Sequence, residues 1–149
     1  MRCVNTGITS DPREVPPVQW AEPKLLIADD DRDFRESLAE VFRKRGFGTS
    51  LAADGKEALE IASQHASTFH LVLMDVHMPR LSGLDAVALL RAELESQVPC
   101  ILMSANLDAD IVRRASELQV ASMLSKPFSL RSLRQVVDDI LRSSYGWPL

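Results

Sequence analysis

The sequence predicts an α/β protein in which five parallel strands form one sheet that carries helices on both faces. Three observations support this fold class. Short apolar runs without polar interruption recur along the chain, which is typical of strands that are covered on both faces. Each run is followed by apolar residues at helical spacing, and the connections between them are short. Because parallel strands need crossover helices that cover the sheet, this alternation favours a doubly wound arrangement.

The first strand and helix follow a polar leader. Residues 1–23 hold half of the chain's eight prolines and show neither strand nor helix periodicity, so we predict a disordered leader outside the fold. Lys24 to Ala28 is a predicted buried strand that runs into three consecutive aspartates. A helix is predicted from there to Gly46, since glycine can take the left-handed conformation of a helix end. Its apolar stripe is Phe34, Leu38, Val41 and Phe42.

The middle of the chain predicts two more strand-helix units. Phe47 to Ala52 is the second strand, and the turn Asp54-Gly55 begins the second helix. Leu71 to Met74 is the third strand, which stops at an acid, Asp75, before the loop Pro79 to Gly83. The apolar stripes that predict the two helices are Ala58, Leu59, Ala62 and Ala66, and then Leu84, Val87, Leu90 and Leu94.

The last two units complete one domain over residues 24–142. The fourth strand, CILMSA, follows Pro99 and ends at Ser104, and a helix follows from about Asp108. Ala121 to Ser125 is the fifth strand, and the last helix runs from Leu130 to about Arg142. Residues 143–149 form a short tail, too short for an output domain. We expect neither tryptophan, Trp20 nor Trp147, to lie in the folded core.

Composition excludes several classes of protein. With 149 residues, 46% of them hydrophobic, the chain has the size and composition of one ordinary globular domain. The formal charge of -4, without a run of basic residues, gives no electrostatic case for nucleic-acid or membrane binding. Cys3 and Cys100 predict neither a disulfide framework nor a metal site, and Cys100 is expected in the core. No secretory signal or membrane span is readable, so we expect a cytoplasmic location.

Polar side chains gather where the predicted strands end. Asp29 and Asp30 follow the first strand, Asp75 the third, Ser104 the fourth and Lys126 the fifth. In a parallel sheet these ends share one edge, where ligands bind. Crowded carboxylates repel one another unless a hard cation such as Mg²⁺ joins them, and a carboxylate can attack phosphorus. A hydroxyl and an amine could hold the other phosphoryl oxygens, so the pattern predicts an aspartyl-phosphate site.

Four motifs in this order resemble the receiver domain of two-component response regulators, in the CheY-like superfamily. They are LLIADD, MDVHMPRLSG, ILMSA and SKPF. Each is weak alone, but the four together with this spacing are specific, and the resemblance covers Lys24 to about Arg142. It implies a flavodoxin-like (βα)5 fold whose strands, numbered along the chain, lie in the order 2-1-3-4-5.

The resemblance also implies roles for the acidic residues. Asp75 is expected to be the phosphoacceptor, with Asp30 and Asp75 as direct ligands of Mg²⁺. Asp29 is expected to act mainly through metal-bound water, and His77 through its backbone carbonyl. The side chain of His77 is expected to face solvent, because Mg²⁺ prefers oxygen ligands. Asp31 is instead predicted to cap the first helix through its open backbone amides.

The remaining implied roles concern phosphoryl binding and its timing. Ser104 and Lys126 are expected to bind phosphoryl oxygens, and the bond from Lys126 to Pro127 is expected to be cis. His77 and Asn106 stand at positions that tune autodephosphorylation in similar domains. Ser104 replaces the more usual threonine and keeps the hydroxyl.

Met123 departs from the family pattern. Receivers commonly carry there an aromatic ring that rotates with the hydroxyl, whereas methionine is a flexible chain. The loop that carries Ser104 can still change the face formed by the last two predicted helices and the fifth strand. That face is the expected site for a downstream partner, and a homodimer is possible.

The expected function is a switch that accepts a phosphoryl group from a histidine kinase or phosphotransfer protein. It acts alone or as the receiver of a longer regulator, and its catalysis is limited to its own phosphorylation and dephosphorylation. One alternative is a haloacid-dehalogenase-like phosphatase with Asp29 as nucleophile, which leaves Asp75 unexplained. A second alternative is a receiver used only for docking, although no member of the acidic set is missing.

Overall fold

The computed structural model describes residues 22–65 and 68–149. Most of the predicted leader, with Cys3 and Trp20, therefore lies outside the described residues. Pro23, which the leader prediction included, is buried, and its carbonyl accepts a hydrogen bond of 2.9 Å from the amide of Gly48. The fold thus begins at least one residue before the predicted start at Lys24.

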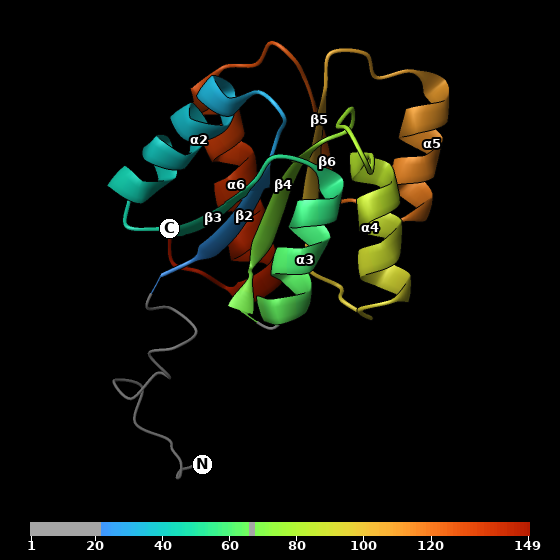
Figure 1. Ribbon diagram of the computed structural model, residues 1–149. Coiled ribbons are helices and arrows are strands. Elements are labelled where there is room, and N and C mark those ends of the chain that lie inside the picture. The colour runs from blue at the N-terminus through green and yellow to red at the C-terminus, as the bar shows by residue number, and fades with distance from the viewer. Residues whose placement is uncertain (1–21, 66–67) are drawn as a thin grey trace, which may run out of the picture.

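Five strands alternate with five helices along the described chain, as predicted. The numbering of the elements starts at β2 and α2, as in Figure 1. The strands are β2 (Lys24–Ala28), β3 (Gly48–Ala52), β4 (Leu71–Asp75), β5 (Cys100–Ser104) and β6 (Ser122–Ser125). The helices are α2 (Arg32–Lys44), α3 (Gly55–His65), α4 (Gly83–Ala92), α5 (Ala109–Glu117) and α6 (Leu130–Tyr145).

All strands of the sheet are parallel, in the order β3-β2-β4-β5-β6. In chain order this is 2-1-3-4-5, so the predicted topology is confirmed. The chain moves outward from β2 to β3 on one side and then continues from β4 on the other. The order of the strands therefore reverses between β2 and β4, the place where open α/β sheets bind ligands.

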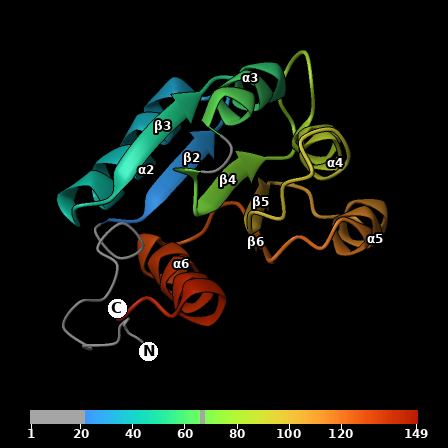
Figure 2. The same ribbon diagram turned by 90° about the horizontal axis from the view of Figure 1, so that it is seen from below.

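Helices cover both faces of the sheet (Figures 1 and 2). α2 and α6 pack on one face through Phe42 and Val137, against strand residues such as Leu25 and Leu73. α3, α4 and α5 cover the other face, where α4 places Leu90 against the alternate strand residues. The central strand β4 is buried at all five positions, because helices lie on both of its sides.

Side-chain caps fix where most of these helices begin. The carboxylate of Asp31 accepts a hydrogen bond of 3.2 Å from the amide of Phe34, which confirms Asp31 as the cap of α2. Ser82, Asp108 and Ser129 cap α4, α5 and α6 in the same way. The loops that leave the carboxyl ends of β2, β4, β5 and β6 are therefore anchored a few residues beyond the sheet.

The prediction that Trp147 lies outside the core is wrong. α6 continues to Tyr145, three residues beyond the predicted end near Arg142, and Gly146 then takes a left-handed conformation with φ 72°. This turn folds the tail back, so that Trp147 is 4% exposed and joins the core between the sheet and the α2–α6 layer. The seven-residue tail SSYGWPL gave no periodic signal for this contact.

Two further predictions concern the core and the membrane. Cys100 is a free, buried thiol, and burial raises its pKa to about 11, which agrees with a core role. None of the helices within the described part of the chain is long and apolar enough to cross a membrane.

Candidate functional site

Three carboxylates meet at the carboxyl ends of β2 and β4. One ligand atom each of Asp29, Asp30 and Asp75 lies within 4.8 Å of the others. Asp29 is fully buried and Asp75 is 7% exposed, whereas Asp30 faces solvent. β2 and β4 are neighbours in the sheet, so these acids converge although they are far apart in sequence. The structure therefore brings together the predicted acidic group.

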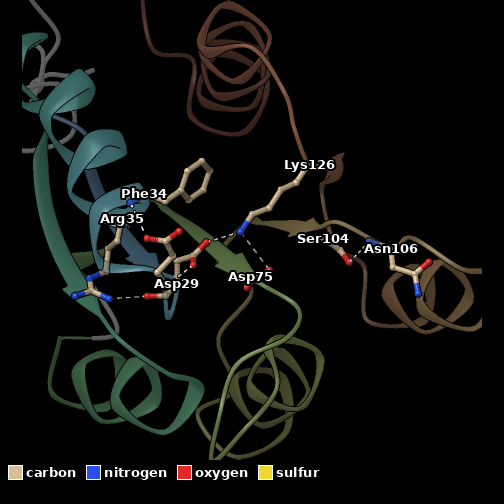
Figure 3. A network of polar contacts seen from close by, with 8 residues as sticks. Asp29, Phe34, Arg35, Asp75, Ser104, Asn106 and Lys126 are labelled. Carbon is tan, nitrogen blue, oxygen red and sulfur yellow. Dashed lines mark hydrogen bonds and ion pairs between the residues drawn. The ribbon is translucent and has the colours of Figure 1, made fainter.

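Lys126, which directly follows the edge strand β6, completes this group (Figure 3). Its Nζ lies 2.7 Å from Oδ2 of Asp29 and 3.6 Å from Oδ1 of Asp75. The backbone amide of Lys126 donates a hydrogen bond of 2.8 Å to the carbonyl of Ser104, which continues the pairing of β6 with β5. The Lys126-Pro127 bond is cis, the state that the resemblance implied.

Asp29 is held on three sides. Its Oδ1 accepts a hydrogen bond of 2.9 Å from the amide of Asp31, and its Oδ2 accepts one from Lys126. Its carbonyl accepts a hydrogen bond of 2.6 Å from the guanidinium of Arg35. Both carboxylate oxygens of Asp29 are thus engaged by protein donors, which leaves Asp30 and Asp75 as the freer pair of acids in this cluster.

The pKa of the Asp75 carboxyl is raised. Burial is the main cause, and the charge of Asp29 adds to it, while the charge of Lys126 acts in the opposite direction. The nearby charge of Asp30 raises the pKa further. The ionised form of Asp75 is thus disfavoured by its surroundings, as expected of a buried carboxylate among like charges.

Ser104 ends β5, next to β4, and is fully buried. Its Oγ accepts a hydrogen bond of 3.0 Å from the amide of Asn106 and so points to the β5–α5 loop, while Lys126 points to the carboxylates (Figure 3). Asn106 and His77 are exposed, in the loops that follow β5 and β4. Met123 lies in β6, partly buried against the α3–α5 side of the core.

Gly83 lies at the site, although the sequence predicted it only as part of the loop Pro79 to Gly83. A Cβ atom at this position would lie 2.2 Å from the carbonyl oxygen of Asp75, so only glycine lets α4 approach the end of β4 this closely. The amide of Gly83 also donates a hydrogen bond of 2.9 Å to the carbonyl of Val76. Its place in the MPRLSG segment was the only signal for this role.

Two contact groups beside the site were not predicted. Arg80 binds the carboxylate of Asp54 through two hydrogen bonds of 2.9 and 3.2 Å, which ties the loop after β4 to the start of α3. Phe34 places its ring 4.5 Å from Nζ of Lys126, and Phe128 packs edge-on against Phe34. Phe34 was predicted only as part of a helix stripe, because periodicity does not reveal what lies at the end of a helix.

The chain is similar to curated proteins of different lengths, of which it spans between 38% and 93%. The chain is 41% identical over 121 residues to the transcriptional activator protein PfeR of Pseudomonas aeruginosa, of which it spans 38%. It is 35% identical over 136 residues to the transcriptional regulatory protein PdtaR of Mycobacterium tuberculosis, of which it spans 61%. It is 31% identical to sporulation initiation phosphotransferase F of Bacillus subtilis, across 79% of this chain and 93% of that protein.

Solved structures of receiver domains have the same fold as this chain. The receiver domain of the Francisella response regulator 1452 superposes with a TM-score of 0.73 at 28% identity, covering 83% of this chain and 99% of that one. A CheY-like receiver domain from Methanospirillum hungatei superposes with a TM-score of 0.77 at 20% identity, over 82% of this chain and 95% of that one, which shows the fold alone.

A family model decides between the alternatives. The model described as the response regulator receiver domain matches residues 25–138, which is most of the chain and includes the acidic cluster and all strand residues except Lys24. This match favours the receiver interpretation over the haloacid-dehalogenase-like phosphatase. The chain therefore belongs to the response regulator receiver domain family.

Proposed function

We propose that this chain is a phosphorylation-controlled switch that accepts a phosphoryl group on Asp75. One observation carries the proposal: a buried carboxylate lies between two further acids and an ammonium that is 3.6 Å away. The phosphoryl donor is a histidine kinase or a histidine phosphotransfer protein, the donors that receivers use. The protein acts in the cytoplasm, where such donors present their phosphohistidine.

The acidic cluster fits Mg²⁺. Its ligand atoms are oxygens within 4.8 Å of one another, and burial together with the like charges of Asp29 and Asp30 raises the pKa of Asp75, an effect that a cation would oppose. Asp30 and Asp75 are the proposed direct ligands, with the backbone carbonyl of His77, while Asp29 acts mainly through bound water. When bound, Mg²⁺ supplies positive charge that offsets the charge of the carboxylates and of the arriving phosphoryl group.

The protein's own groups perform the transfer by position and charge. A carboxylate oxygen of Asp75 forms a bond to phosphorus while the bond from phosphorus to the donor atom breaks, and the donor keeps that electron pair. Lys126 donates a hydrogen bond to a phosphoryl oxygen from its place beside Asp75. Ser104 binds another phosphoryl oxygen, which requires its hydroxyl to turn from the amide of Asn106.

The movement of Ser104 is the proposed start of the switch. Ser104 ends β5 and heads the loop that leads to α5, so its rotation changes the face formed by α5, β6 and α6. Met123 lies on β6, and its flexible chain follows this change by repacking instead of by the rotation of a ring. A downstream protein, a second copy of this chain, or another part of a longer regulator binds that face.

Acetyl phosphate with Mg²⁺ tests the proposal without knowledge of the donor. Wild-type protein is expected to gain one phosphoryl group by intact mass, and Asp75→Asn is expected to gain none. Ser104→Ala and Lys126→Ala are expected to be labelled more slowly. Turnover that survives Asp75→Asn but requires Asp29 would instead support the phosphatase, and a wild-type protein that takes no label would support docking alone.

A further inference from the structure

The ammonium of Lys126 has an aromatic neighbour in addition to its two carboxylates. The face of Phe34 lies with its centroid 4.5 Å from Nζ of Lys126, within the range of a cation–π contact. Asp29 and Asp75 lie 2.7 and 3.6 Å from the same nitrogen. The lysine is only 22% exposed, so the ring replaces water on one side of the charge.

Phe34 is itself fixed from two directions. It stands in the first turn of α2, where its amide donates to the capping carboxylate of Asp31. Phe128, which follows the cis Lys126-Pro127 bond, packs against it edge-to-face with ring centroids 5.8 Å apart. The two rings thus connect the start of α2 to the β6–α6 loop, and Nζ of Lys126 lies against the face of the Phe34 ring.

Lys126 needs such restraint because of its chemistry. A lysine side chain is a flexible stem with rotatable donors, and ordering it costs conformational entropy. Its salt bridge with Asp29 alone would favour a position on Asp29, the acid farther from the transferring group. An aromatic face attracts the ammonium without consuming a hydrogen-bond donor, so the lysine can keep its donors for the acids and the phosphoryl oxygens.

We propose that Phe34 is a positioning residue for phosphoryl transfer, which holds the ammonium of Lys126 beside Asp75 through the face of its ring. This proposal rests on the phosphorylation of Asp75 proposed above. In this role the ring of Phe34 acts only through Lys126. The purely structural alternative is that Phe34 fills space at the edge of the α2–α6 core, where a ring and an aliphatic chain would serve equally.

Replacement of the ring by aliphatic groups separates the two roles. Phe34→Leu is expected to slow labelling of Asp75 by acetyl phosphate about fivefold, the effect of losing a partly desolvated cation–π contact. Phe34→Tyr keeps the ring face and is expected to restore a rate close to that of wild type. The Mg²⁺ affinity of both variants is expected to match wild type, because the ring contacts none of the acids. Phe34→Met provides a second ring-free variant should Phe34→Leu not fold.

Phe47 offers a matched control. Its ring lies 4.8 Å from the guanidinium of Arg45, which is the same kind of contact at the opposite end of α2. Phe47→Leu is expected to lower stability but to leave the labelling rate unchanged.

Four results are decisive. Equal labelling rates in wild type and both ring-free variants would overturn the role of Phe34, as would a Phe34→Tyr variant as slow as Phe34→Leu. Slow labelling only in the ring-free variants supports it. If wild-type protein takes no label on Asp75, the proposed function fails first, and the wild-type sample alone reports that failure.

Discussion

The neighbouring strands β2 and β4 have acidic residues at their carboxyl ends and an aromatic cluster at their amino ends. At their carboxyl ends lie Asp29, Asp30 and Asp75, like charges within 4.8 Å of one another. At their amino ends, His70 accepts a hydrogen bond of 3.0 Å from the amide of Lys24 and is packed by two aromatic rings. The same pair of strands therefore carries the site at one end and an aromatic cluster at the other.

The aromatic cluster consists of His70, Tyr145 and Trp147. Trp147 lies edge-to-face on His70 with centroids 4.7 Å apart, and the hydroxyl of Tyr145 donates a hydrogen bond of 2.7 Å to the carbonyl of His70. Burial, with the charge of Lys24, lowers the pKa of His70, which keeps its imidazole neutral and able to accept the Lys24 amide. These hydrogen bonds engage Nδ1 and the carbonyl of His70 and the hydroxyl of Tyr145, so this end of the sheet stabilises the fold.

Groups that stabilise the fold and groups that react are thus separated along these strands. The acidic end buries charges that repel, which lowers stability in exchange for a place where a cation and a phosphoryl group can bind. The aromatic end contributes packing between the strands and the end of α6. Substitutions at the two ends should therefore change different measured quantities.

Asp75→Asn should have the largest effect on function and the opposite effect on stability. We expect complete loss of phosphoryl labelling together with a higher free energy of unfolding at pH 7 without Mg²⁺, because a disfavoured charge is removed. Intact mass and urea unfolding measure the two quantities. A variant less stable than wild type at pH 7 would contradict the repulsion that the structure shows around Asp75.

The pH dependence of wild type follows from the same group. Because the pKa of Asp75 is raised in the folded state, the folded protein holds its proton more tightly than the unfolded chain does. This contribution to stability is complete below the ordinary pKa of an aspartate and is lost as pH rises through the raised pKa. In Asp75→Asn, the free energy of unfolding should not fall in this way as pH rises. In wild type, added Mg²⁺ should make this fall smaller.

Trp147→Ala should have the largest effect on stability. Removal of this buried ring is expected to lower the free energy of unfolding by about 3 kcal/mol, while the labelling rate of the folded protein stays unchanged. Leu149→Ala, a change at an exposed residue of the same tail, is the control and should have little effect. If labelling fell as steeply as stability under conditions where the variant is folded, the two ends would not be independent.

Gly83→Ala should affect both quantities, because the new Cβ would press on the carbonyl of Asp75. We expect a loss of about 1 to 3 kcal/mol in unfolding free energy, together with slower labelling. Gly48→Ala is the control, since its Cβ would meet only the flexible side chains of Glu22 and Lys24. Equal stability in the two variants would show that the approach of α4 to β4 is not restrictive.

His77→Ala and Asn106→Ala should have the smallest effects, confined to the lifetime of the phosphoryl group. Both side chains are exposed in the loops that follow β4 and β5, and we propose that an attacking water passes them, so each replacement is expected to change the half-life severalfold with unchanged stability. Gln97→Ala, at an exposed loop residue outside the site, should leave the half-life as in wild type. Unchanged half-lives in both site variants would remove their proposed role.

The sequence predicted much of the acidic end of the sheet and little of the aromatic end. Asp29, Asp75 and Lys126 stand directly after apolar runs, and the parallel topology places such positions on one edge. Their meeting follows from strand order, which the resemblance to receiver domains implied. Trp147 lies instead in a segment without periodicity, and its packing depends on one left-handed residue, Gly146. Tyr145 is the last residue of α6, beyond the predicted end of that helix.

Contacts that depend on side-chain direction were also missed at the site itself. The spacing of Phe34 placed it on the buried stripe of α2 but not above Lys126, which lies 92 positions later in the chain. The close approach at Gly83 likewise depends on how α4 packs against β4. The hydrophobic pattern of the sequence predicts the strands and where they end. What covers the reactive groups depends instead on how helices and strands pack against one another.

The most direct test of the central claim is to locate the phosphoryl group. Protein treated with acetyl phosphate and Mg²⁺ is reduced with borohydride, which converts an acyl phosphate to the corresponding alcohol, and its peptides are then read by mass spectrometry. We predict reduction at Asp75 alone. Reduction at Asp29 or Asp30, or at no aspartate of a protein that nevertheless carries the label, would contradict the account.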